Sequence, residues 1–230
     1  MAEMGLGYGS EFQLMRFLGH HRNYLNTLIR ETVKIDGEIQ WLDYPADNKR
    51  LSGDGEWENI LCFEKLKNYT DITNKWKDYW PPKGKGMNWD GIFRIGDIWF
   101  FVEAKAHEGE CRQKCQASET SKDIIARAFR KTQEWLKADK PKSPWIDSNC
   151  YQLANRLTFL YFCKTQDIQA KLLYIGFLNG FKEKVDEVTD IKRWISIWNE
   201  EFKTLGLDEE IMSSHIYFIY PDCENPPISY

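Results

Sequence analysis

The spacing of apolar residues along the chain predicts helices that alternate with short buried strands. Helical periodicity is expected over residues 10–34, 55–68, 118–137, 148–164 and 183–205. Apolar runs typical of strands occupy residues 88–95, 98–105, 171–178 and 215–220. This order indicates an α/β protein with a central mixed β-sheet flanked by helices. We expect a helical extension over residues 1–50 and an α/β domain over 51–230, with one single domain over 1–230 as the alternative.

The two runs at residues 88–95 and 98–105 predict a β-hairpin. They are joined by Gly96-Asp97, and a two-residue loop that begins with glycine is typical of a type II′ turn. Such a turn pairs Ile95 with Ile98 and thereby fixes the register of every residue further along the two strands.

Counting outward along that register places Asp90 opposite Glu103, and strand alternation places Lys105 on the same face as Glu103. Opposed like charges repel, so the sequence predicts a divalent cation between the two carboxylates. Carboxylate oxygens suit Mg²⁺, and an adjacent ammonium group could orient a water or stabilise charge on a phosphate. The competing interpretation is a strand-end ion pair between Glu103 and Lys105, with Asp90 as a turn residue.

Asp90 followed by Glu103-Ala104-Lys105 resembles the motif of the PD-(D/E)XK nuclease superfamily, which has the restriction-endonuclease-like fold. In that layout a helix precedes the hairpin, and a polar helix and another strand follow it. We expect residues 55–68, 118–137 and 171–178 to fill these places. Trp89 stands where the family often has proline, and the sequence does not locate the first core strand.

The resemblance implies a metal-dependent phosphodiesterase, an endonuclease that hydrolyses DNA by in-line attack of metal-activated water. Asp90, Glu103 and the Ala104 carbonyl would hold Mg²⁺, for which Mn²⁺ could substitute, and Lys105 would position or activate the water. Host defence or restriction, DNA repair and mobile-element processing are compatible with this activity. RNA is an alternative substrate. The rival hypothesis is a catalytically inactive protein of the same fold that binds nucleic acid or a protein partner.

Many members of the superfamily also carry a glutamate on the first helix. Glu56, which follows Gly55, resembles the start of such a helix, and Glu58 and Glu64 are the alternatives. Glu64 shares the predicted face of the apolar residues and is expected to point inward. The competing interpretation of Glu56 is a first-turn acid that the helix dipole stabilises.

Charge is distributed unevenly along the chain. The net charge is −4, yet residues 104–142 carry 10 basic and 6 acidic side chains. Residues 65–85 mix lysines with aromatic residues, which suits stacking on unpaired bases. The competing interpretation of this stretch is a surface lobe with packed tryptophans. The candidate nucleic-acid-binding residues are Lys83, Lys85, Lys122, Arg127, Arg130, Lys131, Gln152, Asn155 and Arg156. For the helical members, the competing interpretation is a solvated helix face.

His107 follows Lys105 by two residues and could lie at the edge of the predicted site. Together with Cys111 and Cys115 it could instead hold a soft metal on one helix face, although Gly109 disfavours that helix. No secretory leader or membrane-length apolar run is visible, so we expect a cytoplasmic protein with reduced cysteines. Double-strand cleavage would favour a homodimer.

Overall fold

A five-stranded mixed sheet, with strand order β1-β4-β5-β6-β7, forms the centre of the computed structural model. The structure describes residues 9–42, 57–58, 63–64, 66, 68–81, 87–181 and 186–226. The sheet consists of β1 (Ile39–Trp41), β4 (Gly91–Ile95), β5 (Ile98–Lys105), β6 (Ala170–Gly176) and β7 (Ile216–Ile219). Neighbouring strands run antiparallel from β1 to β5 and parallel from β5 to β7. A separate two-stranded sheet pairs β2 (Trp57–Glu58) with β3 (Asn88–Trp89).

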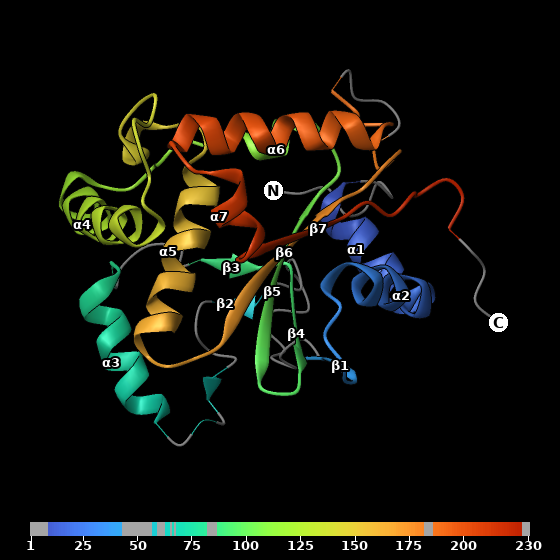
Figure 1. Cartoon of the computed structure of the whole chain (residues 1–230), viewed down its shortest axis with the longest axis horizontal. Helices are drawn as coiled ribbons and strands as arrows, with labels where there is room; N and C mark the ends of the chain where they lie inside the picture. Colours follow the sequence, from blue (N-terminus) through green and yellow to red (C-terminus); the bar gives the residue numbers. More distant parts are fainter. Residues whose placement is uncertain are drawn as a thin grey trace.

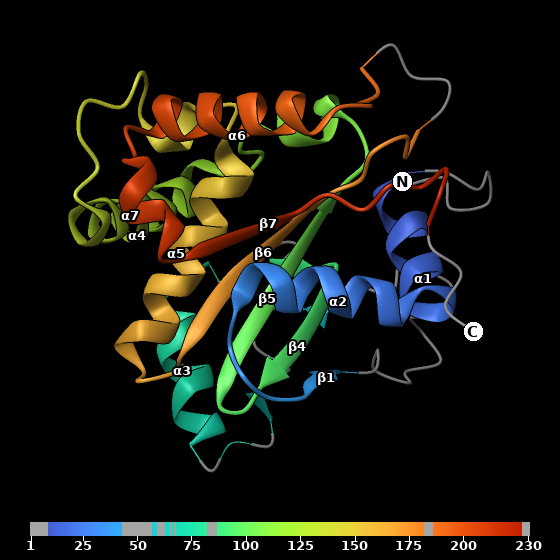
Figure 2. The ribbon, with the colours of Figure 1, turned by 45° about the vertical axis from the view of Figure 1, so that its right-hand side comes forward.

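Helices cover both faces of this sheet, as Figures 1 and 2 show. One layer holds α1 (Ser10–His20) and α2 (Arg22–Val33), and the other holds α4 (Glu119–Leu136), α5 (Tyr151–Thr165) and α6 (Ile191–Leu205). The remaining helices are α3 (Tyr69–Tyr79) and the short α7 (Glu209–Ser213). Each layer has its own apolar core against the sheet. The predicted α/β architecture with a helix-flanked mixed sheet is therefore confirmed.

The predicted hairpin forms with its predicted register. Ile95 pairs with Ile98, and the ladder continues to the pair of Gly91 with Val102. Gly96 has a φ of 57°, a left-handed conformation that glycine adopts without strain at the first position of the turn. The local turn signal was thus sufficient to fix which side chains share a face.

Most predicted helices form, with boundaries set by capping groups. Ser118 caps α4 and Asp190 caps α6 by accepting backbone N–H donors from Ser121 and Lys192. Because of this cap, α6 begins at Ile191, later than the predicted residue 183. The predicted helix over residues 10–34 is two helices, interrupted at His21.

The helix predicted over residues 55–68 is wrong for the residues that the structure describes there. Trp57 and Glu58 lie in β2, and residues 63–64 form only a short turn. The helices that precede the first strand of the main sheet are α1 and α2. That first strand is β1, which pairs antiparallel with β4. The described part of residues 1–50 is therefore built into the same sheet and core as the hairpin.

The lysine- and aromatic-rich stretch is organised around α3. Its helical stripe places Trp76 in the core, where the indole packs edge-on against Phe159 and Phe162. Trp80 is buried as well, stacked on Trp76. Packing therefore occupies these two rings, as the competing interpretation of packed tryptophans predicts, and leaves neither indole free to stack on a base.

Candidate active site

Asp90 lies where the chain passes from β3 to β4. Its backbone N–H donates to the carbonyl of Val102 at 3.2 Å, and one carboxylate oxygen accepts the N–H of Ala104 at 2.6 Å. The ladder of paired residues ends at the pair of Gly91 with Val102, so the predicted pairing of Asp90 with Glu103 is not part of it. A backbone amide thus binds the Asp90 carboxylate.

Glu103 lies in the middle of the sheet and is 2% exposed. One of its carboxylate oxygens accepts from the Lys105 ammonium at 2.5 Å, and the other accepts from Nε of Arg156 at 2.7 Å. Two protein cations therefore compensate one buried carboxylate. The predicted repulsion between Asp90 and Glu103 can be relieved without a metal ion, because each carboxylate has its own protein partners.

Electrostatics keep all three groups of this network charged. Burial alone would raise the pKa of Glu103, but the charges of Arg156 and Lys105 outweigh it and lower that pKa. Burial disfavours the ammonium form of Lys105, yet Glu103, Asp90 and Glu110 together raise its pKa above the ordinary value. Lys105 is therefore an ammonium group at neutral pH.

Three of the candidate nucleic-acid-binding residues, Gln152, Asn155 and Arg156, lie on α5, and Arg156 reaches this network. Arg156 is buried in α5, stacks on the indole of Trp89 at 4.6 Å and donates to the Asn88 carbonyl at 2.7 Å. The Asn155 side chain accepts from the Arg156 guanidinium at 3.1 Å, whereas Gln152 is only partly buried. Arg156 thus holds Glu103 in place, a role that the sequence did not predict.

Two groups around the site, Tyr174 and Glu201, were missed by sequence reasoning, and Cys111, which the sequence offered only as a ligand of a soft metal, lies near them. Tyr174 neighbours Glu103 on β6, and among the described residues no group hydrogen-bonds its buried hydroxyl. Glu201 of α6 is buried, and burial raises its pKa to about 8 although Lys105 partly offsets this. Cys111 is buried nearby, and burial raises the pKa of its thiol. Only the tertiary fold brings β6 and α6 to β5, and no local pattern predicts it.

Glu110 is a third missed group. The short 3₁₀ turn at Glu108–Cys111 folds the chain back, so that Glu110 accepts the N–H of Ala106 at 2.6 Å. Its other oxygen accepts the Ser10 hydroxyl at 3.0 Å, which brings the start of α1 to the same place. A carboxylate from outside the predicted motif therefore lies beside Lys105, whose pKa it raises.

The oxygen donors at this strand end fit Mg²⁺ chemically. The Lys105 carbonyl accepts from the N–H of Phe177, the residue directly after β6, so the polar backbone groups of Ala104 face the opposite, β4 side, where Asp90 lies. A carboxylate offers about four lone-pair positions, and two protein cations contact Glu103. Asp90, Glu103 and the Ala104 carbonyl thus form a set of hard oxygen donors. Within the described ranges, no cluster of three or more His, Cys, Asp or Glu side chains could hold a metal ion.

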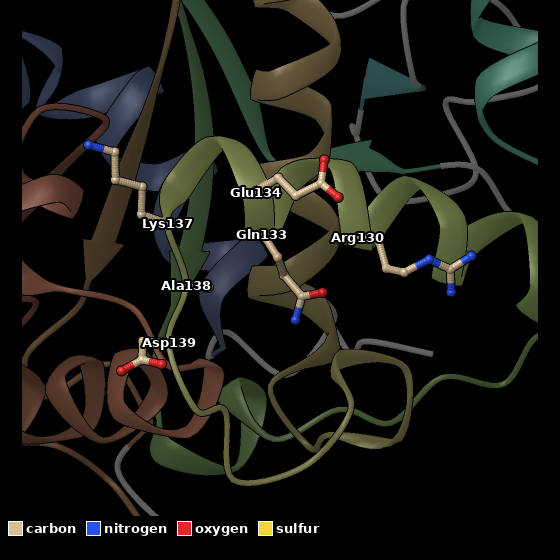
Figure 3. A pocket seen from close by; sticks show the side chains of 6 residues that line it. All are labelled: Arg130, Gln133, Glu134, Lys137, Ala138 and Asp139. Carbon is tan, nitrogen blue, oxygen red and sulfur yellow. The ribbon is translucent and has the colours of Figure 1, made fainter.

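The predicted nucleic-acid-binding residues of α4 lie at its surface. Arg127, Arg130 and Lys131 are exposed, and Lys122 pairs with Glu119 at 2.8 Å. Arg130 is one of six residues that line a hollow of about 480 Å³ beside the end of this helix. Figure 3 shows the side chains of these residues. The hollow is lined by two cations, Arg130 and Lys137, by two carboxylates, Glu134 and Asp139, and by Gln133 and Ala138. It therefore has no excess positive charge. The hollow alone therefore does not indicate a phosphate site.

Other predicted residues fall elsewhere. Glu56, Lys83 and Lys85 lie outside the described residues. Glu64, expected to point inward, is exposed, because the helix that would have turned it toward the core does not form. The helix face that would align His107 with Cys111 and Cys115 is also absent, since the turn spans only Glu108–Cys111.

No protein-family model, curated protein or solved structure matches this chain. Among the described residues, no helix is both long and apolar enough to cross a membrane.

Proposed function

We propose that this protein is a Mg²⁺-dependent nuclease that hydrolyses phosphodiester bonds in DNA. One observation carries the proposal: the Asp90 carboxylate, the polar backbone of Ala104 and the ion pair of Glu103 with Lys105 converge at one end of the β4–β5 hairpin. The parallel strand β6 beyond β5, and the antiparallel strand β1 beyond β4, add to the resemblance to the PD-(D/E)XK nuclease superfamily.

Each residue of the site has a role that its environment supports. When bound, Mg²⁺ would supply Lewis-acid polarisation of a phosphoryl oxygen and a lower pKa for a water. Asp90, Glu103 and the Ala104 carbonyl would hold it. Lys105 is an ammonium group, so it would orient the attacking water and stabilise negative charge on the phosphate instead of taking a proton. Arg156 would keep Glu103 oriented.

The surface of α4 supports a polyanionic substrate. Arg127, Arg130 and Lys131 are exposed on the segment of the chain where basic residues exceed acidic ones. Contacts from such side chains to phosphates dominate the affinity of proteins for nucleic acid and weaken as salt rises. We therefore infer that α4 binds the backbone of the substrate.

The decisive experiment is a cleavage assay with plasmid, single-stranded DNA and RNA, with Mg²⁺ or with EDTA. We expect the wild type to cleave DNA only with the metal, and Asp90→Asn and Lys105→Ala to be at least about 100-fold slower. Asp123→Asn and Lys192→Ala, at exposed positions, are matched controls that should cleave normally. Metal-dependent cleavage that persists unchanged in Asp90→Asn would contradict the assignment.

A second candidate function is a non-catalytic binding protein on the same fold. The observation that favours it is the complete pairing of Glu103 with Lys105 and Arg156, which a purely structural network would also show. That candidate predicts DNA binding without cleavage of any substrate at any Mg²⁺ concentration. It also predicts that Asp90→Asn leaves binding unchanged.

A further inference from the structure

His107 and Asp186 form a hydrogen-bonded pair beyond the end of β5. The Nδ1 atom of His107 lies 2.8 Å from a carboxylate oxygen of Asp186, and the same oxygen accepts the N–H of Gly109 at 2.9 Å. A carboxylate only accepts, so Nδ1 carries the proton and Nε2 is the position that can exchange one. Phe181 packs edge-on against the ring at 5.1 Å. The imidazole is therefore held in one orientation.

Glu110 links this pair to the candidate site. One of its oxygens lies 3.9 Å from Nε2 of His107, and the other accepts the N–H of Ala106, the residue directly after Lys105. The Glu110 charge acts on Lys105 as well. His107 and Lys105 are thus two residues apart, a span of about 7 Å in an extended chain, with one carboxylate beside both.

Lys105 and His107 differ in their access to solvent. The side chain of Lys105 is 6% exposed, whereas that of His107 is 13% exposed. A proton donor must recover its proton from solvent after each turnover, and the more accessible His107 suits that task. Glu110 on one side and Asp186 on the other place two carboxylates against the imidazole.

We propose that His107 is the general acid of the hydrolysis and that Asp186 is its positioning residue. This inference rests on the proposed nuclease function and adds to it the group that protonates the leaving oxygen. Water forms the new P–O bond, and the P–O bond to the leaving nucleotide breaks with its electron pair on oxygen. That oxygen takes the proton from Nε2 of His107. The water proton passes to solvent, from which the imidazole is protonated again.

The test compares DNA with a substrate whose leaving oxygen at the scissile bond is replaced by sulfur. A thiolate leaves without protonation, so a missing general acid should matter only for the oxygen substrate. We expect His107→Gln to cleave ordinary DNA about 100-fold more slowly and to cleave the sulfur substrate at nearly the wild-type rate. Asp186→Asn should lose less activity on ordinary DNA and should likewise cleave the sulfur substrate at nearly the wild-type rate. If His107→Gln does not fold, Asp186→Asn tests the proposal in its place. His20→Gln, an exposed substitution of the same kind, should match the wild type on both substrates.

The outcomes separate this inference from the proposed function. Equal losses of His107→Gln on the two substrates, or no loss on ordinary DNA, would overturn the role of His107 and leave the nuclease intact. Lys105→Ala should stay slow on both substrates, because its role does not depend on the leaving group. A wild type that cleaves neither substrate would overturn the nuclease and, with it, the role of His107.

Discussion

At the scale of single residues, the buried network around Glu103 governs the site. Glu103, Lys105 and Arg156 are all nearly inaccessible to solvent, and their charges compensate one another only in part. Removing one partner from such a network leaves an uncompensated buried charge, which typically costs about 3–5 kcal/mol. The same three residues that would serve catalysis therefore also determine whether the sheet can form around a charged centre.

Glu201 allows a prediction about pH. Its pKa in the folded protein is about 8, because burial disfavours the carboxylate. An unfolded glutamate titrates near pH 4.5, so between these values the folded state binds more protons than the unfolded state. The free energy of unfolding should therefore fall as pH rises from about 4.5 to about 8.

We expect Glu201→Gln to remove this dependence, since the amide mimics the protonated acid. At pH 8.5 the variant should be more stable than the wild type by roughly 2–4 kcal/mol, and at pH 5 the difference should be small. Urea denaturation at the two pH values measures this. Glu200→Gln, the exposed neighbour, is the control. A Glu201→Gln variant with the same pH slope as the wild type would show that Glu201 is ionised when folded.

At the scale of elements, the contacts at helix ends lock distant segments together. α6 ends at Gly206, which has a φ of 69° in the left-handed region. The backbone N–H of Asp139, in the segment after α4, donates to the Gly206 carbonyl at 2.8 Å. One glycine therefore ends a helix and also lets the segment after α4 approach its backbone closely.

Substitution of this glycine tests that dual role. A Cβ at position 206 would collide with the backbone of Asp139 and Pro141, and the left-handed φ adds strain. We expect Gly206→Ala to lower the free energy of unfolding by about 3 kcal/mol. Gly19→Ala is the matched control: no atom lies within 4 Å of the added Cβ, so this helical position should gain about 0.5–1 kcal/mol. Equal effects of the two substitutions in thermal denaturation would refute this account.

At the scale of the whole molecule, one sheet couples two separate apolar cores. Phe17 of α1 is fully buried and packs on Phe177 at 5.3 Å, on one face of the sheet. Trp89, Trp145 and Trp194 lie in the core of the other face. If both cores unfold together with the sheet, a substitution in one core must shift the unfolding transition that the tryptophans of the other core report.

We therefore expect Phe17→Ala to lower stability by about 3–5 kcal/mol, with the same shift by tryptophan fluorescence and by far-ultraviolet circular dichroism. Met15→Ala on the same helix, where the side chain is 42% exposed, should change stability little. A fluorescence transition that stays at its wild-type midpoint in Phe17→Ala would mean that α1 and α2 unfold as an independent unit.

Local patterns in the sequence determined the elements. The Gly96-Asp97 loop fixed the register of the hairpin, and with it the shared face of Glu103 and Lys105. Periodic apolar stripes located most helices. The same reasoning failed over residues 55–68, because helical spacing of a few apolar residues does not exclude a short strand and turn.

Only the tertiary structure decided which distant groups meet. Arg156 reaches Glu103 across 53 positions, and Asp186 reaches His107 across 79. Periodicity tells which side of an element is buried, but it does not tell which other element covers that side. The partners that neutralise, orient or crowd each charged group follow from the order of strands in the sheet and the packing of α5 and α6 upon it.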